Sequence, residues 1–234
     1  MPTKVYVGDE LEIFAKATNW KKYYFSFIKP YLKGSVLEVG AGIGGSTILL
    51  CDGTQKNWTC MEPDIKQTRK IKEVIKKSQI PDYCKTVTGT IKDLDKKTFF
   101  DTIIYIDVLE HIKNDSEELE MAASHLAQGG FLIIGVPANQ WLYTKFDKAI
   151  GHYRRYNKGM LKSLIPYGLK QEKLIYLDSV GLFASFSNKI LRQDYPTERQ
   201  VLFWSNVIIK ISEFTDRIFR YSFGKQIIGV WKKL

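Results

Sequence analysis

Short apolar runs alternate with amphipathic stretches along the first 137 residues of this 234-residue chain. Runs of apolar and β-branched residues that end in glycine, proline or an acid predict strands. Between them, apolar residues spaced three and four apart predict helices, as in the lysine-rich segment 64–77, where Ile71 and Val74 share the inner face. This alternation favours a parallel sheet with helices on both faces. The predicted strands cover residues 35–39, 57–62, 84–88, 101–106, 131–136, 171–178 and 226–231, the last of them returning to the sheet edge.

The regular alternation stops after residue 137, where an aromatic and basic loop-like segment begins. The fold class is therefore α/β, with a doubly wound, seven-stranded, mostly parallel sheet of Rossmann-like type. We expect a single domain over residues 1–234, with a cofactor-binding core at 34–137 and insertions at 137–168 and 179–222 that cap one end of the sheet. The predicted helices cover residues 9–32, 44–51, 64–77, 115–127, 158–165, 180–193 and 198–220.

The formal net charge of +10 is concentrated in two segments of the chain. Residues 141–170 contain seven lysines and arginines and one aspartate, and residues 201–234 contain six basic and two acidic residues. A basic surface rich in aromatic residues attracts phosphates, anionic lipids or nucleic acid. The alternative, a solvated face that keeps the protein in solution, stays open.

Neither a membrane span nor a signal peptide is predicted. No window of about 18 uninterrupted apolar residues occurs, and charges interrupt the apolar residues of the N-terminal segment. The three cysteines form no CxxC pair, which indicates free thiols in a reducing compartment, and we expect no metal site. These features predict a cytoplasmic protein, and peripheral contact with the inner face of an anionic membrane stays open as an alternative.

The segment 36–47, VLEVGAGIGGST, predicts a buried strand, a tight turn and the start of a helix. Gly40, Gly42 and Gly45 satisfy the GxGxxG fingerprint, and Gly40, Gly42 and Gly44 satisfy a looser GxGxG pattern. Glycines at such a turn let the backbone approach a ligand and point helix N-terminal N–H groups toward it. The glycines by themselves do not choose between NAD and another adenosine-containing ligand.

Two acids narrow the choice of ligand. Glu38 lies inside the first strand, where a buried carboxylate is costly unless it meets a donor such as a ligand ammonium group. Glu62, at the end of the second strand, is placed to accept hydrogen bonds from two ribose hydroxyls.

At this point the chain resembles the class I S-adenosylmethionine-dependent methyltransferases. The resemblance depends on VLEVGAGIG at 36–44, Glu62, FDTIIYIDVLEHI at 100–112 and GGFLIIGVP at 129–137, in the family's order and spacing. FDKAIGHYRRYNKGML at 146–161 is similar to a motif of one bacterial and archaeal branch, often associated with cell-envelope polysaccharide or lipid-linked sugar pathways. The resemblance implies S-adenosylmethionine as the cofactor and S-adenosylhomocysteine as its product.

The resemblance also implies a map of the cofactor site. Glu38 would hold the amino group, Glu62 the ribose, and a tyrosine of the N-terminal helix, Tyr23 or Tyr24, the carboxylate, although both tyrosines could equally be packing residues. Thr90 stands where the family commonly has an aspartate that accepts from the adenine amino group. The cofactor-binding residues predicted in this way are Tyr23, Glu38, Gly40, Ala41, Gly42, Gly44, Glu62, Pro63, Thr90, Ile91, Asp107 and Val108.

The candidate catalytic residues are two of the three histidines. His111 in VLEHI and His152 in GHYRRY could act as general bases toward a hydroxyl or amine acceptor, whereas His125 is interpreted as a surface or packing residue. A pair of arginines could clamp an anionic group, although one of them could instead pair with Asp147, and the aromatic residues could stack on a substrate or form the underside of a lid. The predicted substrate-binding residues are Trp141, Tyr143, Arg154, Arg155 and Tyr156.

The predicted function is methyl transfer from S-adenosylmethionine to an oxygen or nitrogen of a small or lipid- or sugar-linked acceptor that carries negative charge. The alternatives are an NAD(P)-dependent oxidoreductase and a non-catalytic binding protein on the methyltransferase fold. Nucleic acid is not favoured as a substrate, because residues 106–109 are IDVL rather than the NPPY or DPPY of amino-methylating nucleic-acid enzymes, and no Pro-Cys nucleophile is present. The predicted helices at 180–220 would cap the active site, and the oligomeric state stays open.

Overall fold

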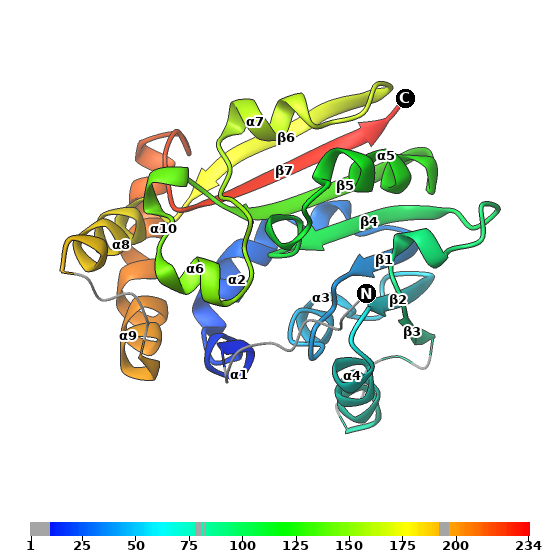
Figure 1. Ribbon diagram of the computed structural model, residues 1–234, viewed down its shortest axis with the longest axis horizontal. Coiled ribbons are helices and arrows are strands. Elements are labelled where there is room, and N and C mark those ends of the chain that lie inside the picture. Colours follow the sequence, from blue (N-terminus) through cyan, green and yellow to red (C-terminus); the bar gives the residue numbers. More distant parts are fainter. Residues whose placement is uncertain (1–9, 78–80, 82, 192–196) are drawn as a thin grey trace.

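A seven-stranded sheet forms the centre of the protein in the computed structural model, which describes residues 10–77, 81, 83–191 and 197–234 (Figure 1). The strand order is β3-β2-β1-β4-β5-β7-β6. The first five strands run parallel, and β7 is antiparallel to both β5 and β6. The predicted α/β class and mostly parallel sheet are thereby confirmed. The strands are β1 (Ser35–Val39), β2 (Asn57–Glu62), β3 (Cys84–Thr88), β4 (Phe100–Ile106), β5 (Leu126–Pro137), β6 (Leu169–Leu177) and β7 (Gln226–Lys233).

The prediction that the last strand lies at the sheet edge is wrong. Strand β7 inserts between β5 and β6, and β6 is the edge strand. The first six residues of β7 are all buried, whereas most of β6 is exposed or half-buried. An apolar strand that is covered on both faces gains more from a central position, where both rows of backbone groups are paired.

The helices differ from the prediction mainly at their boundaries. The expected helix 9–32 is divided into α1, α2 and a short 3-10 turn, with the buried Ala17 between the first two. The expected helix 198–220 is a continuous helical stretch that contains a π-helical turn, η5 (Trp204–Ile208). The helices are α1 (Glu10–Ala15), α2 (Thr18–Ser26), α3 (Thr47–Leu50), α4 (Ile65–Lys77), α5 (Asp115–Ser124), α6 (Lys145–Ala149), α7 (Lys158–Ser163), α8 (Ser179–Ile190), α9 (Glu198–Phe203) and α10 (Ile209–Ile218), with 3-10 turns η1 (Lys29–Tyr31), η2 (Ile91–Asp93), η3 (Leu109–His111) and η4 (Gln140–Leu142).

Strand β5 begins earlier than expected, at Leu126 rather than Phe131. Helix α5 ends at Ser124, and Leu126 pairs with Phe100 at the start of β4. His125 connects the two elements, and its backbone carbonyl accepts a hydrogen bond from the N–H of Phe100. Gly129 and Gly130 therefore lie within β5.

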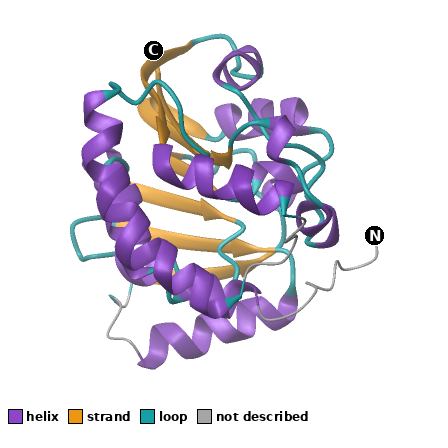
Figure 2. Cartoon of the chain, turned by 90° about the vertical axis from the view of Figure 1, so that its left-hand side faces the viewer, coloured by secondary structure: helices purple, strands orange, loops and turns teal. Residues whose placement is uncertain are grey.

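Two hydrophobic clusters lie on the two faces of the sheet, and Figure 2 shows helices on both sides of it. Neighbouring strand residues belong to different clusters: Val36 packs in one and Leu37 in the other, and Ile104 and Ile103 do the same in β4. Cys51, Cys60 and Cys84 are buried and form no disulfide, as predicted. Among the described residues, no helix is long and apolar enough to cross a bilayer.

Two buried aspartates position the C-terminal helices. The Asp178 carboxylate accepts from Trp204 Nε1 (2.7 Å) and Ser212 Oγ (2.6 Å). The Asp216 carboxylate accepts from the backbone N–H of Asp178 (2.7 Å) and from the hydroxyl of Tyr23 (2.8 Å). These bonds connect α8, η5 and α10 to α2. In Figure 1, α6, α8 and α9 lie on the side toward which the arrows of β4 and β6 point.

Candidate active site

The glycine turn after β1 forms the floor of the site. Gly40, Gly42 and Gly44 all have positive φ, 66°, 58° and 80°. At Gly40 the close packing also excludes a side chain, because a Cβ there would lie 2.6 Å from Cγ2 of Val108. Backbone conformation and space both require glycine at this position, and the contact brings the segment after β4 directly onto the turn.

Glu38 lies beneath this turn and is only 3% exposed. Its Oε2 accepts hydrogen bonds from Thr47 Oγ1 (2.7 Å) and Trp58 Nε1 (2.9 Å). Burial raises the pKa of Glu38 to about 7, although the bonds from Thr47 and Trp58 oppose this shift. Neither donor uses the second oxygen, Oε1.

Lys21, which the sequence analysis did not single out, brings a cation to the same turn. From α2, its Nζ donates to the backbone carbonyl of Gly45 (3.2 Å). Burial lowers the pKa of Lys21, while the charges of Asp107 and Glu38 oppose that effect. The helical period places Lys21 on the same face as the buried Tyr24 and could have indicated this orientation.

The hydroxyl of Tyr23 is used in a contact with another helix, as the alternative of a packing residue implies, and its contact with the cofactor carboxylate stays a prediction. Its hydroxyl donates to Asp216 of α10. The hydroxyl of Tyr24 is buried and has no hydrogen-bond partner among the described residues. It lies so close to Gly135 that any side chain there would overlap it. Of the two tyrosines, one is therefore a fixed structural contact and the other is packed against β5.

Glu62 lies beside the turn at the end of β2 and is fully buried. Its Oε2 accepts from the backbone N–H of Gly42 (2.9 Å), and its Oε1 accepts from that of Asp64 (3.0 Å). Burial raises the pKa of Glu62, and the two backbone donors oppose the shift. Pro63, which lies between Glu62 and Asp64 in the chain, is exposed. The carboxylate that was predicted to hold a ribose thus also holds the glycine turn.

Thr90 and Ile91 follow β3. The N–H and Oγ1 of Thr90 both donate to Oδ2 of Asp93 (2.7 and 3.0 Å). Asp93 therefore brings an exposed carboxylate to the position where the family commonly has aspartate, and the T-x-x-D capping spacing was its signal. Ile91 is 1% exposed and packs in a core cluster, and its contact with the cofactor stays a prediction.

The segment after β4 turns sharply over the glycine turn. Asp107 has a φ of 54°, is exposed, and accepts a hydrogen bond from Nε2 of Gln226 (2.5 Å). Val108 packs on Gly40. Both predicted residues are therefore next to the turn, and η3 begins directly after them.

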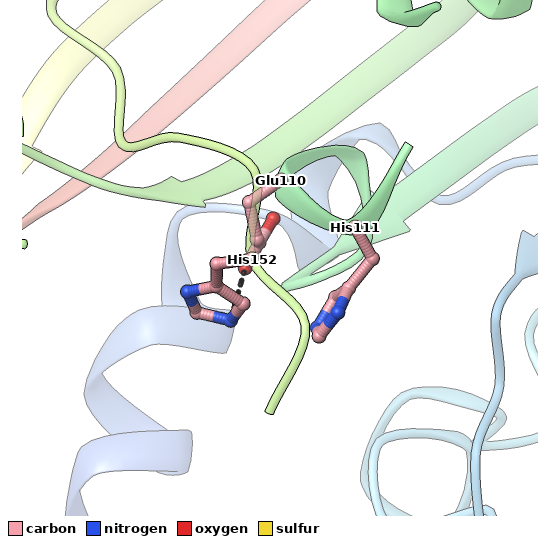
Figure 3. Close-up of side chains that lie close together, drawn as sticks. All are labelled: Glu110, His111 and His152. Carbon is pink, nitrogen blue, oxygen red and sulfur yellow. Dashed lines mark ion pairs between the residues drawn. The ribbon is translucent and has the colours of Figure 1, made fainter. Parts of the chain in front are cut away.

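Glu110, His111 and His152 come together at η3, although 41 residues separate the two histidines (Figure 3). Oε1 of Glu110 lies 3.8 Å from Nε2 of His152, and the two imidazole rings are 4.6 Å apart between centroids. Glu110 is fully buried, and burial raises its pKa well above the ordinary range. The two predicted catalytic histidines are thus neighbours, and the sequence analysis missed the carboxylate of Glu110 beside them.

Asp147 organises the GHYRRY segment. Its carboxylate accepts from Nδ1 of His152 (2.9 Å), from Nε of Arg155 (2.8 Å) and from the backbone N–H of Thr144 (2.9 Å). Burial alone would raise the pKa of Asp147, but the bond to His152 and the charge of Arg155 hold it well below its ordinary value. Of the alternatives open for Arg155, the structure has the ion pair with Asp147.

A second ion pair connects the same segment to α5. Nη1 of Arg154 donates to Oδ2 of Asp115 (2.5 Å), and Nη2 donates to the carbonyl of Lys113 (2.8 Å). Tyr156 donates to the same aspartate (2.8 Å) and is fully buried, and its contact with the substrate stays a prediction. Both arginines are therefore engaged by carboxylates of the protein itself.

The two remaining predicted substrate residues lie at the rim of the segment. Trp141 is 49% exposed, and its ring packs edge-on against Phe186 of α8 at 5.6 Å. The hydroxyl of Tyr143 donates to the carbonyl of His152 (2.7 Å). Lys189 of α8 donates to the carbonyls of Trp141 and Tyr143. Trp141 thus exposes an aromatic ring at the rim, whereas the hydroxyl of Tyr143 fixes the backbone of His152.

Comparisons with known proteins agree with this geometry. The family described as a methyltransferase domain matches residues 17–179. A search of curated proteins finds no match. Among solved structures, coclaurine N-methyltransferase bound to N-methylheliamine and S-adenosylhomocysteine is similar, with a TM-score of 0.62 and 14% identity over 93% of this chain and 72% of that one.

Two bacterial structures are similar over nearly their whole length. The N-methyltransferase NodS from Bradyrhizobium japonicum, in complex with S-adenosylhomocysteine, has a TM-score of 0.58 and 10% identity over 94% of this chain and 87% of that one. An S-adenosylmethionine-dependent methyltransferase from Clostridium acetobutylicum has a TM-score of 0.59 and 12% identity over 93% of this chain and 92% of that one. At such identities the structures establish the shared fold.

The fold and the glycine turn define a class I methyltransferase, and the family match covers more than half of the chain. The chain belongs to the methyltransferase domain family and is an S-adenosylmethionine-dependent methyltransferase. The alternative of an NAD(P)-dependent oxidoreductase is therefore wrong.

Proposed function

We propose that this enzyme transfers a methyl group from S-adenosylmethionine to an oxygen or nitrogen of a small, lipid- or sugar-linked acceptor that carries negative charge. The observation that carries the proposal is the cluster of Glu110, His111 and His152 at η3, the turn that follows Val108, because Val108 packs on the glycine turn. A methyl sulfonium needs positioning rather than activation, but a hydroxyl or amine acceptor must lose a proton. Imidazole and carboxylate groups beside the methyl donor supply that function.

The amino-acid part of the cofactor would be recognised by two opposite charges. Nζ of Lys21 lies at the carbonyl of Gly45 and would pair with the cofactor carboxylate. Oε1 of Glu38, which neither Thr47 nor Trp58 uses, would accept from the ammonium group. Glu62 would accept from the ribose hydroxyls by giving up one of its two backbone donors. Asp93, held by Thr90, would accept from the adenine amino group.

An apolar face beside the site supports a lipid-linked acceptor. Large hydrophobic side chains of α8 and its C-cap, α9, η5 and α10 are exposed, and Phe186 packs against Trp141 at the rim. Exposed large apolar side chains in such number favour contact with a ligand or partner over bare solvent. The resemblance of residues 146–161 to a lipid-linked sugar branch of the family points in the same direction. The exposed residues are Phe183, Phe186, Ile190, Leu191, Phe203, Val207, Ile211, Phe214 and Ile218.

Basic residues near this face would favour anionic acceptors and peripheral contact with an anionic membrane. Lys145 and Lys148 are exposed on α6, and Lys210 and Arg217 are exposed on α10. They take the role that the sequence analysis assigned to Arg154 and Arg155, whose guanidinium groups are held by Asp115 and Asp147. Each basic residue near an anionic bilayer contributes about 1 kcal/mol of attraction.

The test of the acceptor class uses S-adenosylmethionine with a radiolabelled methyl group and a lysate divided into organic-extractable, small aqueous, nucleic-acid and protein fractions. We expect the label in the organic fraction or in anionic small molecules. A label that enters only nucleic acid or protein would overturn the proposed acceptor class. A heat-treated lysate distinguishes methyl transfer by this enzyme from that by the lysate's own enzymes.

A further inference from the structure

We propose that Glu110, His111 and His152 form a binding site for one divalent transition-metal ion. One ligand atom from each residue lies within 4.8 Å of the other two (Figure 3). Metal bonds of about 2.0–2.2 Å place two ligand atoms at most about 4.4 Å apart. Side-chain rotations that move the ligand atoms by about 1 Å therefore bring all three atoms into one coordination sphere.

The first argument is the state of the Glu110 carboxylate. The side chain is fully buried, and neither of its oxygens has a hydrogen-bond partner among the described residues. An isolated buried carboxylate costs several kcal/mol, so native proteins pair such a group with a donor or a cation. The only ion-pair contact described for it is to Nε2 of His152, at 3.8 Å. That distance is too long for a hydrogen bond and leaves room for an ion between the two groups.

The second argument is the orientation of His152. An ionised Asp147 can only accept hydrogen bonds, and it already accepts from Arg155 and Thr144. Its contact with Nδ1 of His152 (2.9 Å) therefore places the ring proton on Nδ1. Nε2 then presents a lone pair toward Oε1 of Glu110. Two acceptors that face each other repel unless a proton or a metal cation lies between them.

The third argument is the shell around the cluster. A carboxylate behind a metal-binding imidazole is a recurrent arrangement that fixes the tautomer and raises the basicity of the ligand. The backbone also fixes the two halves of the site, since the N–H of Tyr153 donates to the carbonyl of Glu110 (2.7 Å). The hydroxyl of Tyr143 donates to the carbonyl of His152 (2.7 Å). The site is thus held rigidly although its ligands come from two distant parts of the chain.

The ligand set selects the kind of metal. Two imidazole nitrogens and one carboxylate oxygen suit borderline ions from Mn²⁺ to Zn²⁺, whereas Mg²⁺ and Ca²⁺ prefer sites made only of oxygen. Three protein ligands leave coordination positions open. An open coordination position would hold the hydroxyl of the methyl acceptor and lower the pKa of that hydroxyl. This role of the metal ion, unlike its binding, rests on the proposed methyl transfer. The metal site would then favour oxygen over nitrogen as the methylated atom.

The rival interpretation is a protonated His152 that forms a simple ion pair with Glu110. A titration of chelator-treated protein with Co²⁺ decides between the two, because bound Co²⁺ has a visible absorption spectrum and Zn²⁺ competes for its site. We expect one Co²⁺ per chain and full displacement by Zn²⁺. Absence of stoichiometric binding would overturn the proposal and favour the ion pair.

Substitutions test whether Co²⁺ binds to Glu110, His111 and His152. Glu110→Gln and His152→Ala each remove a ligand and should weaken Co²⁺ binding by at least 10–100-fold, the loss typical even of an outer-shell partner. Asp147→Asn, which removes the positioning carboxylate, should weaken it by about 10–100-fold. Glu117→Gln changes an exposed acid of α5 that pairs with Lys92 of η2, and it should leave Co²⁺ binding unchanged. Equal binding by all four variants would contradict the assignment.

Two controls show that a loss of Co²⁺ binding does not come from unfolding and does not depend on the identity of the methyl acceptor. Each variant is checked for S-adenosylhomocysteine binding and for a cooperative thermal transition. His111→Ala replaces any variant that fails to fold, because His111 is only half-buried. The Co²⁺ titration needs no methyl acceptor, so an error in the proposed acceptor class would leave its result unchanged. Conversely, the methyl-transfer assay can be interpreted even if the protein binds no Co²⁺.

Discussion

The carboxylate of Glu62 accepts a hydrogen bond from the backbone N–H of Gly42 at 2.9 Å, which joins the end of β2 to the glycine turn after β1. Its other oxygen accepts from the N–H of Asp64. One side chain therefore fixes the shape of the turn and stands at the predicted ribose position. Loss of this carboxylate should affect cofactor binding through both roles.

Replacement of Glu62 by Gln is expected to weaken S-adenosylhomocysteine binding by about 10–100-fold, since a hydrogen bond to a charged group contributes about 1.5–3 kcal/mol. Isothermal titration calorimetry measures the change. Glu73→Gln on the exposed side of α4 is the matched control and should bind as the wild type does. Unchanged affinity of the Glu62 variant would show that this carboxylate does not contribute to the cofactor site.

Lys21 and Lys22 are adjacent in α2 but face different surroundings. Lys21 lies at the glycine turn, whereas Lys22 is exposed. Lys21→Ala should weaken S-adenosylhomocysteine binding by about 10-fold or more, because a charge-assisted pair with the cofactor carboxylate is lost. Lys22→Ala should have no effect. Equal affinities for the two variants would remove Lys21 from the cofactor site.

The raised pKa of Glu38 predicts a pH-dependent stability. Its pKa in the folded protein, about 7, lies above the ordinary value of 4.5. The stabilisation from the protonated form is complete below pH 4.5 and is lost as the pH rises through 7. Relative to Glu38→Gln, whose amide stays neutral, the wild type should lose about 2–3 kcal/mol of unfolding free energy between pH 5 and pH 8.

Chemical denaturation of both proteins at the two pH values measures this difference. The pair Glu73 and Glu73→Gln reports any general effect of removing a carboxylate, since Glu73 is exposed. A constant difference between wild type and Glu38→Gln across this pH range would mean that Glu38 titrates in the folded state as it does in the unfolded chain.

Arg154 is expected to stabilise the fold rather than hold the substrate. Arg154→Ala leaves the buried Asp115 without its guanidinium partner, and breaking such a partly buried pair costs about 1–3 kcal/mol. We expect a lower Tm with an unchanged acceptor KM, measured by calorimetry and steady-state kinetics. Arg69→Ala, at an exposed position of α4, is the control. A raised KM at an unchanged Tm would restore the predicted substrate clamp.

The apolar face of α8 and α10 should bind anionic vesicles. Replacement of Phe183 and Phe214 by Ser, at 60% and 67% exposure, should reduce sedimentation with phosphatidylglycerol vesicles about 10-fold or more, because about 1.5–3 kcal/mol of burial is lost for each side chain that inserts. Phe99→Ser, at 55% exposure between β3 and β4, should have no effect. Vesicle binding that survives the double substitution would locate the membrane contact elsewhere.

Local pattern was sufficient for much of the fold and for the glycine turn after β1. The VLEVGAGIG segment contains its strand, its turn glycines and Glu38 within nine residues, and the structure retains that local order. The strand positions of β1 to β4 were predicted to within one residue, because their apolar runs are short and bounded. Such information lies between close neighbours in the chain, where spacing alone determines which side chains share a face.

The sequence by itself thus determined the fold class, the methyltransferase family and the place of the glycine turn. Only the tertiary structure decided that β7 inserts between β5 and β6. It also decided that the hydroxyl of Tyr23 donates to Asp216 and that Nζ of Lys21 donates to the carbonyl of Gly45. It alone decided that Arg154 and Arg155 hold their own segment and that Glu110 meets His152. The physical reason is that these contacts join residues 8 to 193 positions apart, and burial and hydrogen bonding choose between partners that no local spacing distinguishes.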